Sequence, residues 1–426
     1  MKIRVERDVL AEAVAWAARS LPARPPVPVL AGLMLDASTD NGGRLVLSSF
    51  DYEVSARVEV AADISEPGVA LVSGRLLADI SRSLPARPVE ITTDAAKVVV
   101  TCGSSRFTLL TLPVEDYPSL PEMPSASGSL RGDAFAAAVA QVSVAAGRDD
   151  TLPVLTGVRL EIEGEKITMA ATDRYRLAVR DLPWAPEQSG LSAIALVPAR
   201  TLSETAKSLA GADKVTVALA ASGAGEGLVG FEGGGRRTTS RLLDGEFPKY
   251  KSLLPTESAS VATVDTAALI ESVRRVALVA ERNTPIRLSF TGAEVTLEAG
   301  TGDEAQASES LDATLTGDDI SIAFNPAYLL DGLLDRALGD HLRRTADEGR
   351  PGDPPADALG NGVGIEHVRE HVGVREELDQ RIEDALAAAR RNEPVVDDGD
   401  AHVPRPLPRR HPPRLVSRRH ARPPSK

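Results

Sequence analysis

The stretch that decides the fold, residues 151–183, reads TLPVLTGVRLEIEGEKITMAATDRYRLAVRDLP, and parts of it recur upstream. Its beginning, Pro153-Val-Leu-Thr-Gly157, repeats Pro28-Val-Leu-Ala-Gly32 at an offset of 125 residues. Its later part, Ala171-Thr-Asp173-Arg-Tyr175, stands where Ser49-Phe-Asp51-Tyr52 stands, at an offset of 122 residues. A period that holds with small slippage indicates duplicated domains, so we expect a tandem array of similar units.

Each repeat is predicted to open with an amphipathic helix. Residues 6–20 place apolar side chains such as Leu10, Val14 and Ala17 at helical spacing. Similar helices are predicted to open at Asp133 and at Asp265. Short alternating strands separated by turn residues follow each of them, so every repeat combines helix with strands.

A second helix is predicted in each of the first two repeats, over Arg75–Arg82 and over Arg200–Lys207. Both begin and end on a basic residue, two turns apart on one face, with Asp79 or Glu204 between them. One interpretation is a solvated helix face with an internal ion pair. Because the pattern recurs at the repeat period, the other interpretation is a basic stripe suited to phosphates.

Residue usage excludes several kinds of site. The single cysteine, Cys102, excludes an internal disulfide framework and a cysteine zinc cluster, and we interpret it as a small buried hydrophobe. All 6 histidines lie beyond residue 340, so the repeats hold no Ser-His pair, histidine metal site or histidine base. Apolar runs are short and the start lacks a signal-peptide pattern, so we expect a cytoplasmic protein without cofactor, metal or membrane attachment.

Closing segments that end at Pro118 and Pro248 set the predicted boundaries. The expected units are domain one over 1–124, domain two over 127–258 and an incomplete domain three over 264–335. Gly225-Glu-Gly-Leu-Val-Gly230 fits a dinucleotide-binding pattern, but no helix opens at its last glycine, so we interpret it as a glycine-rich hairpin.

Residues 336–426 do not continue the repeat of helices and strands. They contain no Phe, Trp or Tyr, and they carry 16 Arg against one Lys, with 11 Pro. Without aromatic anchors such a segment has little with which to offset chain entropy, so a divergent, mostly disordered tail is predicted. Only Arg375–Arg391 reads as a lone helix.

Seven segments resemble, in order, a known family: MKIRVERDVL, SLPARPPVPVL, RFTLLTLP, LPVLTGVRLE, AATDRYRLAV, LLDGEFPKY and IAFNPAYLLDGL. The family is the bacterial DNA polymerase III beta subunit, the sliding clamp, and the resemblance runs from Met1 to about Leu333. It implies an α+β protein of three clamp domains, each with two helices packed on antiparallel sheets. It also implies a homodimer that closes head to tail around duplex DNA.

The resemblance implies a processivity factor without catalytic residues. Its partners would be double-stranded DNA, encircled without base-specific recognition, the DNA polymerase III catalytic subunit, the clamp loader and other proteins with clamp-binding motifs. The residues before 336 carry 31 Lys and Arg against 45 Asp and Glu, which is poor for an ordinary DNA binder. A ring does not need strong contacts with DNA, because encirclement keeps it on the duplex. Basic residues on its inner side then interact only weakly with the phosphates.

The resemblance also assigns site residues. Those expected to face DNA are Arg24, Arg75, Arg82, Arg148, Arg200 and Lys207. Those expected to line a pocket for partner peptides are Leu155, Thr172, Tyr175, Leu177, Pro248 and Leu253, each of which could instead be ordinary core. Those expected at the seam between two chains are Phe107, Leu109, Leu278 and Val279.

The chain departs from the family after about residue 333, where further strands of the third domain should follow. Asp347–Asp353 can be encoded so that reading one base later gives Thr-Lys-Ala-Val-Leu-Val-Thr, which looks like a missing strand. We therefore infer a frameshift near residue 334. Two alternatives remain open: a clamp-like scaffold that binds proteins without closing a ring, and an enzyme acting through Asp51 and Asp173, which otherwise read as turn residues.

Overall fold

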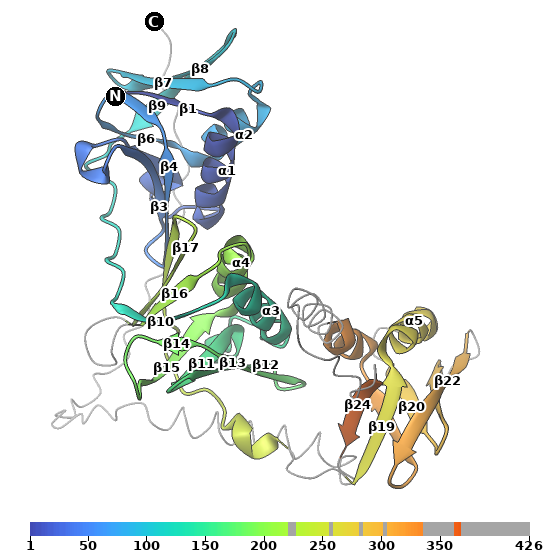
Figure 1. Ribbon diagram of the computed structural model, residues 1–426. Coiled ribbons are helices and arrows are strands. Elements are labelled where there is room, and N and C mark those ends of the chain that lie inside the picture. The colour runs from blue at the N-terminus through green and yellow to red at the C-terminus, as the bar shows by residue number, and fades with distance from the viewer. Residues whose placement is uncertain (220–226, 255–258, 281–283, 301–304, 335–361, 368–426) are drawn as a thin grey trace, which may run out of the picture.

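A computed structural model describes residues 1–219, 227–254, 259–280, 284–300, 305–334 and 362–367. Three modules follow one another along the chain and together form a bent body (Figure 1). The helices of the first two modules lie on the inner side of the bend, and the sheets lie behind them. The helices predicted near the start and middle of the repeats are confirmed.

The first module packs two helices on antiparallel strands. Its helices are α1 (Arg7–Ala17) and α2 (Gly74–Ser83), with short 3-10 turns η1 (Ala18–Ser20), η2 (Pro28–Ala31) and η3 (Thr39–Asn41). Its strands are β1 (Lys2–Val5), β2 (Gly32–Asp36), β3 (Arg44–Phe50), β4 (Val54–Ala61), β5 (Asp63–Glu66), β6 (Val69–Ser73), β7 (Val89–Asp94), β8 (Lys97–Cys102) and β9 (Ser105–Leu112).

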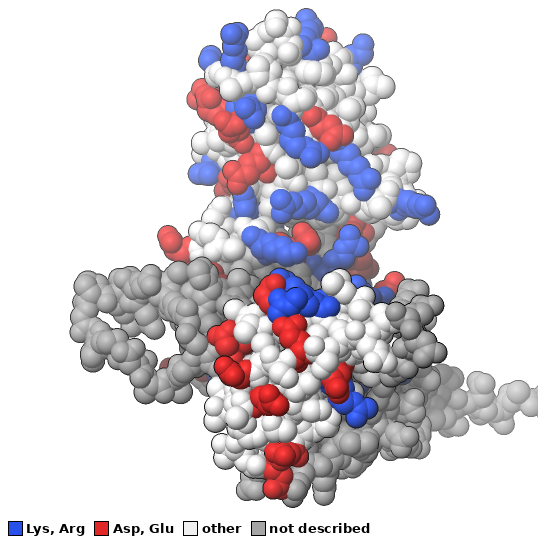
Figure 2. All heavy atoms as spheres, turned by 90° about the vertical axis from the view of Figure 1, so that its right-hand side faces the viewer, with Lys and Arg blue, Asp and Glu red and all other residues white. Residues whose placement is uncertain are grey.

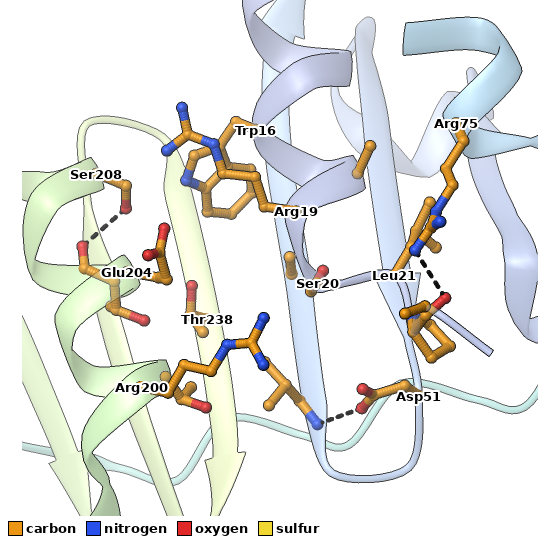
Figure 3. Close-up of a pocket in the computed structure, with 17 residues that line it drawn as sticks. Trp16, Arg19, Ser20, Leu21, Asp51, Arg75, Arg200, Glu204, Ser208 and Thr238 are labelled. Carbon is orange, nitrogen blue, oxygen red and sulfur yellow. Dashed lines mark hydrogen bonds between the residues drawn. The ribbon is translucent and has the colours of Figure 1, made fainter. Parts of the chain in front are cut away.

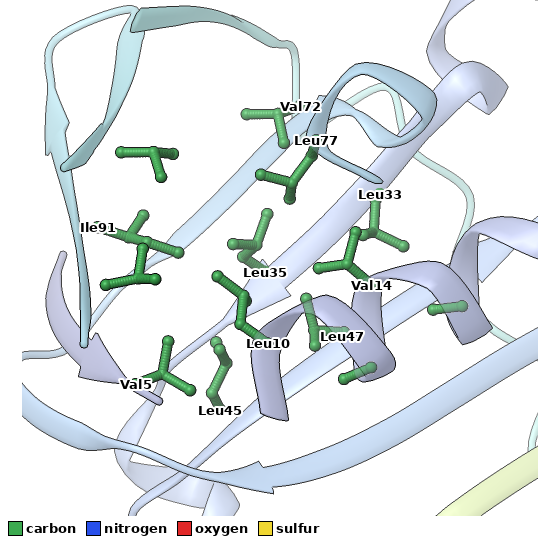
Figure 4. Packing of buried hydrophobic residues seen from close by; sticks show 14 of the residues in the cluster. Val5, Leu10, Val14, Leu33, Leu35, Leu45, Leu47, Val72, Leu77 and Ile91 are labelled. Carbon is green, nitrogen blue, oxygen red and sulfur yellow. The ribbon is translucent and has the colours of Figure 1, made fainter. Parts of the chain in front are cut away.

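The core of this module lies between the helices and the sheet (Figure 4). Leu10 and Val14 of α1 and Leu77 of α2 are fully buried. They meet the inward residues of the strands, among them Leu35 and Leu47. Truncating one such leucine to alanine lowers the free energy of unfolding by about 2–5 kcal/mol. Burial of these side chains therefore determines which face of each helix packs on the sheet.

The second module repeats this plan. Its helices are α3 (Gly132–Ser143) and α4 (Ala199–Leu209), with 3-10 turns η4 (Pro153–Thr156) and η5 (Tyr250–Leu253). Its strands are β10 (Ala126–Leu130), β11 (Gly157–Glu163), β12 (Lys166–Thr172), β13 (Leu177–Pro183), β14 (Ala185–Pro186), β15 (Ser192–Pro198), β16 (Val215–Leu219), β17 (Leu228–Gly233) and β18 (Arg236–Arg241). The expected glycine-rich hairpin is present from Leu228 onward, because β17 and β18 pair directly across Gly234 and Gly235, whereas Gly225 and Glu226 lie outside the described residues.

A continuous antiparallel sheet joins the first two modules. Strand β18 pairs with β4 from Arg236, opposite Val58, to Ser240, opposite Val54. A buried hydroxyl pair reinforces this junction, since the Oγ of Ser55 and the Oγ1 of Thr239 lie 2.6 Å apart. The two modules are therefore fixed relative to each other by backbone hydrogen bonds.

Among the residues that the structure describes, the third module has one complete helix and fewer strands than the first two. Its elements are β19 (Ser260–Asp265), α5 (Thr266–Val276), η6 (Ala277–Val279), β20 (Ile286–Phe290), β21 (Glu294–Ala299), β22 (Ala307–Thr316) and β23 (Ile320–Phe324), and residues 326–334 are helical. Asp265 caps α5, because its carboxylate accepts a hydrogen bond from the Ala268 amide at 2.8 Å. The core is built on Leu269, Val273 and Leu288.

One further strand comes from the divergent segment. Strand β24 (Gly362–His367) pairs antiparallel with the edge of β19. The sequence prediction placed no strand there, and this part of it was wrong. An unpaired strand edge can pair with any extended segment that reaches it. The short apolar run around Val363 and Ile365 gives no clear strand pattern in the sequence. The helix expected over Arg375–Arg391 lies outside the described residues.

Candidate nucleic-acid interface and partner pocket

Basic side chains gather on the helix-bearing face of the first module. Figure 2 shows Lys and Arg over this face and at the junction below it, whereas the third module, in front, carries mainly Asp and Glu. The expected DNA-facing residues of α2 and α4, Arg75, Arg82, Arg200 and Lys207, are all exposed. A field of this kind suits a polyanion on the inner side of the bend.

Ion pairs are present on both second helices, as one interpretation of the sequence expected. The Nη2 of Arg82 lies 2.7 Å from the Oδ1 of Asp79, and the Nζ of Lys207 lies 3.7 Å from the Oε1 of Glu204. All four side chains are more than half exposed, so each pair is worth only about 0–1 kcal/mol. These contacts leave the cations available to an outside anion.

The first members of the two basic patterns come together. Arg75 and Arg200 line one cavity between the first and second modules. Arg24 is exposed in the loop between η1 and η2. Arg148 lies elsewhere, because it follows α3 and lines a second cavity beside Tyr175. Among the expected DNA-facing residues, Arg75 and Arg200 therefore line the first cavity, whereas Arg148 lines the second.

That second cavity, of about 600 Å³, is lined by two of the six residues expected in the partner pocket. Leu155, which is buried, and Tyr175, which is 51% exposed, both line it. Leu177 lines an adjoining cavity of about 540 Å³. Both cavities are completed by Tyr328 and Asp331 of the third module. Sequence reasoning missed these last two residues, which lie in the helical segment 326–334.

A tight turn presents Tyr175 to the cavity. The carboxylate of Asp173 accepts hydrogen bonds from the amides of Tyr175 and Arg176, at 3.1 and 3.0 Å. Buried Thr172 donates its hydroxyl to the Arg176 carbonyl at 2.7 Å. Arg174 has a φ of 78°, in the left-handed region. Thr172 therefore supports the pocket from beneath and does not line it.

Arg176 joins the second module to the third. Its Nη1 lies 2.6 Å from the Oδ2 of Asp331, its Nε lies 3.0 Å from the Oδ2 of Asp173, and its guanidinium lies 4.4 Å from the ring centre of Tyr328. Burial alone would lower the pKa of Arg176, but the two carboxylates outweigh it and raise that pKa. Tyr175 also stacks on Tyr328, with ring centres 6.4 Å apart.

Pro248 and Leu253 line neither cavity among the described residues. They belong to the segment after β18, where Phe247 and Tyr250 are buried and pack against Leu177. Pro248 is buried and Leu253 is half-buried. These two positions therefore stay predictions as pocket residues.

A buried carboxylate anchors the same segment. Glu161, 5% exposed, lies 2.6 Å from the Nε of Arg159 and 2.8 Å from the Nζ of Lys251. Burial alone would raise the pKa of Glu161, but hydrogen bonds from Lys251 and Arg159 lower it below its usual value. Burial raises the pKa of Tyr250 to about 12, with help from the negative charge of Glu161. Lys251 thus ties the end of the second module to its sheet.

The expected seam residues differ in exposure. Leu278 is 84% exposed and Val279 is half-buried, in η6. On β9, Phe107 is half-buried, but Leu109 is buried in the core of the first module. Leu110, which was not predicted, is 71% exposed. Alternate residues of a strand face opposite sides, so the outward position falls on Leu110.

The aspartates considered for an enzyme act as turn residues. Asp51 accepts hydrogen bonds from the amides of Glu53 and Val54, and Asp173 does the same for its own turn. Cys102 is buried, as expected. Among the described residues no cluster of His, Cys, Asp or Glu could hold a metal ion, and no helix could cross a membrane.

Comparison with known proteins gives one consistent result. The family models for the N-terminal, central and C-terminal domains of the DNA polymerase III beta subunit match residues 1–121, 129–249 and 251–336. The solved sliding clamp of Pseudomonas aeruginosa bound to griselimycin has a TM-score of 0.73 and 29% identity, over 79% of this chain and 90% of that one.

Two bacterial relatives are closer in sequence to this chain than the Pseudomonas aeruginosa clamp is. The beta sliding clamp of Streptomyces coelicolor is 69% identical over 333 residues, which cover 78% of this chain and 88% of the relative. The beta sliding clamp of Micrococcus luteus is 57% identical over 315 residues, which cover 74% of this chain and 100% of the relative. This chain belongs to the DNA polymerase III beta subunit family, the bacterial beta sliding clamps.

Proposed function

We propose that this chain is the subunit of a ring that encircles duplex DNA and tethers the replicative polymerase. The observation that carries the proposal is the sheet shared by the first two modules, which places exposed basic helices on the inner side of a bend. Continuing the same bend through further modules closes a ring. Such a ring holds DNA by topology and slides, because its contacts to phosphates are few and weak.

The junction within the chain offers a template for the seam between two chains. Strand β18, which pairs with β4, matches β9 at an offset of 131 residues, since the two-residue turns of the hairpins β8–β9 and β17–β18 align, and Arg237 matches Arg106 and Thr239 matches Thr108. Among the described residues, the edge of β9 from 105 to 110 that faces away from β8 has no strand partner. It is therefore the strand that would join a second chain.

The strand that should receive β9 is β22 of the partner chain. It matches β4, because β3 and β21 carry the same alternation and pair with β4 and β22 in the same way. Arg57 lies opposite Arg237 in the junction within the chain, and Ser308 is its equivalent on β22. Arg106 of one chain would then face Ser308 of the next, and Ser105 would face Glu309.

The pocket formed by Leu155, Tyr175 and Leu177 is the proposed site for a clamp-binding peptide of the polymerase, the clamp loader and other partners. It offers an apolar floor and aromatic walls, with polar groups at its rim, as peptide sites commonly do. Proteins that compete for one such pocket would exchange on a clamp that stays on DNA.

We further propose that the residues after about 334 are read in a shifted frame. The family match ends at residue 336, and a relative that is 69% identical matches over 333 residues. An abrupt end to so close a match is typical of a shifted reading frame. The proposal predicts that sequencing the gene across this point recovers the family's remaining strands in the neighbouring frame.

Polymerase processivity tests the function. A chain with the family's reading frame restored should lengthen the products that a replicative polymerase makes from a primed template in one binding event. The chain as given should stimulate poorly, because its third module lacks strands that support the seam. Equal, strong stimulation by both chains would show that the restored strands are not needed, and none by either would contradict the function.

A further inference from the structure

The turn beside the cavity between the second and third modules carries an arginine in a disfavoured backbone conformation. Arg174 has a φ of 78°, where the Cβ of an L-residue crowds the backbone and glycine does not. The turn itself imposes this φ, since Tyr52, the equivalent residue 122 positions upstream, has a φ of 76°. A large cation at such a position therefore suggests a role for its side chain beyond the turn.

The equivalent turn of the first module does not bring this position to a cavity. Figure 3 shows its aspartate, Asp51, accepting an amide hydrogen bond beside the cavity between the first and second modules. Tyr52 does not line that cavity, whereas Arg174 lines the cavity of about 600 Å³ between the second and third modules. The arginine is thus particular to the cavity that we propose as a peptide site.

The carboxylates that line this cavity are already engaged. Asp149 accepts hydrogen bonds from the amide and the hydroxyl of Thr151, at 2.9 and 2.7 Å. Asp173 accepts hydrogen bonds from two amides of its own turn, and Asp331 pairs with Arg176. Arg176 is the one cation of the lining that these carboxylates hold.

The guanidinium of Arg174 remains available. It has no hydrogen-bond or ion-pair partner among the described residues, and its carbon lies 5.8 Å from the ring centre of exposed Tyr175. Hydrogen bonds from Thr151 are the main cause of the lowered pKa of Asp149, and the charge of Arg174 is the smallest. Arg174 therefore offers unused donors beside the aromatic wall of the pocket.

We propose that Arg174 selects partner peptides that carry an acidic residue close to the apolar side chain bound in the cavity. A guanidinium binds a carboxylate through two parallel hydrogen bonds. An extended peptide advances about 3.3 Å per residue, so a carboxylate one or two positions from the residue against Tyr175 reaches Arg174. Exposed Arg148 also lines the cavity and adds to its positive field. The proposal rests on the proposed peptide pocket and specifies which ligands it prefers.

A phosphate of the encircled duplex is the other anion to consider for Arg174. The turn that carries it joins β12 to β13, whereas the helices of the first two modules lie on the inner side of the bend. Its guanidinium also lies over Tyr175, a wall of the peptide cavity. Both observations favour the peptide.

Fluorescence anisotropy of labelled peptides with the full chain tests the proposal. The peptides share two leucines and a phenylalanine as apolar anchors, and they carry Asp, Asn or Lys one or two positions from the first anchor. The unsubstituted chain should bind the better Asp peptide about tenfold more tightly than its Asn counterpart, and the Lys peptide most weakly. The preference should shrink as salt rises, because the rim of the cavity is open to solvent.

Substitution by glycine separates binding from folding. Arg174→Gly keeps the left-handed turn, so the midpoint of urea unfolding should not fall, while the Asp and Asn peptides should bind within about twofold of each other. Arg174→Lys should retain part of the preference, because a positive charge stays at the rim. The control, Arg87→Gln, removes an exposed arginine that has no side-chain partner among the described residues and does not line the cavity. It should leave the preference unchanged.

Four results would contradict the proposal in distinguishable ways. Equal binding of the Asp and Asn peptides by the unsubstituted chain would overturn the selection while the pocket stands. A preference that survives in Arg174→Gly would place the selection on another residue. An unchanged preference together with weaker binding of a labelled 20-base-pair duplex by Arg174→Gly would assign the arginine to DNA instead. Failure of the unsubstituted chain to bind any of the peptides would overturn the pocket as well.

Discussion

Arg176 in the second module and Asp331 in the third form an ion pair of 2.6 Å, although they are 155 residues apart in the chain. The same guanidinium contacts Asp173 and lies over Tyr328, so the turn that presents Tyr175 is tied to the third module. Arg176 thus contributes both to the turn beside the cavity and to the contact with the third module, together with the stacking of Tyr175 on Tyr328.

Removing the carboxylate should loosen this docking. Asp331→Asn should lower the free energy of unfolding by about 1 kcal/mol, since the pair is hydrogen-bonded but Asp331 is 39% exposed. Urea denaturation followed by circular dichroism measures the change. The control is Asp319→Asn, an exposed carboxylate with no partner among the described residues. Equal effects of the two substitutions would show that the pair contributes nothing.

Acid should weaken the anchor at Glu161. Its folded pKa lies below its ordinary value of 4.5, so its contribution is present above that value and is lost as pH falls through the folded pKa. Glu161→Gln should therefore cost about 1–3 kcal/mol near neutral pH, and the difference from wild type should shrink below about pH 4.5. Fluorescence of Trp184 during urea unfolding, with Trp16→Phe in both proteins, reports on the second module.

Exposed Glu165 supplies the control for this prediction, because its side chain has no partner among the described residues. Glu165→Gln should leave the unfolding free energy unchanged within about 0.5 kcal/mol at every pH. A Glu161→Gln cost that stays constant from neutral to acid pH would contradict the assigned role of the carboxylate.

Partner binding should depend on Tyr175. Tyr175→Ala removes an aromatic wall of the cavity and its stacking on Tyr328, so the affinity for a clamp-binding peptide of the polymerase should fall about tenfold or more. Calorimetry measures it. Tyr52→Ala is a matched control, since Tyr52 is 46% exposed and lines neither pocket cavity. Undiminished binding to the Tyr175 variant would place the peptide elsewhere.

The proposed seam makes a register prediction. In the frame-restored chain, Arg106→Cys on β9 should lie opposite Ser308→Cys on β22 of a second chain, because Arg237 and Arg57 occupy the equivalent positions in the junction within one chain. Opposed residues in antiparallel strands lie close enough for a disulfide. Mild oxidation should give a covalent dimer of the double variant. A more efficient cross-link to Ser310→Cys would refute this register.

Much of this architecture follows from sequence pattern alone. The repeat around Pro153 and Pro28 predicts the tandem modules, and helical spacing predicts α1, α3 and α5. These features are local, so they leave a local signal. Period and propensity are enough to find them.

The features that sequence reasoning missed depend on which face of a strand a residue occupies and on contacts between residues far apart in the chain. The neighbours Leu109 and Leu110 differ only in which strand face they occupy, and a one-residue difference in register reverses that choice. The contact between Arg176 and Asp331 joins positions far apart in the chain, and no period marks it. The cavity lined by Arg75 and Arg200 exists only because β4 and β18 bring two modules together.

Retention on circular DNA tests the central claim most directly. The frame-restored chain, loaded by a clamp loader onto nicked circular DNA and passed through a sizing column in high salt, should stay with the DNA. It should be released when the same DNA is linearised, because an encircling ring slides off a free end and salt removes only ionic contacts. Equal retention on both forms, or release from both, would contradict a ring that holds DNA by encirclement.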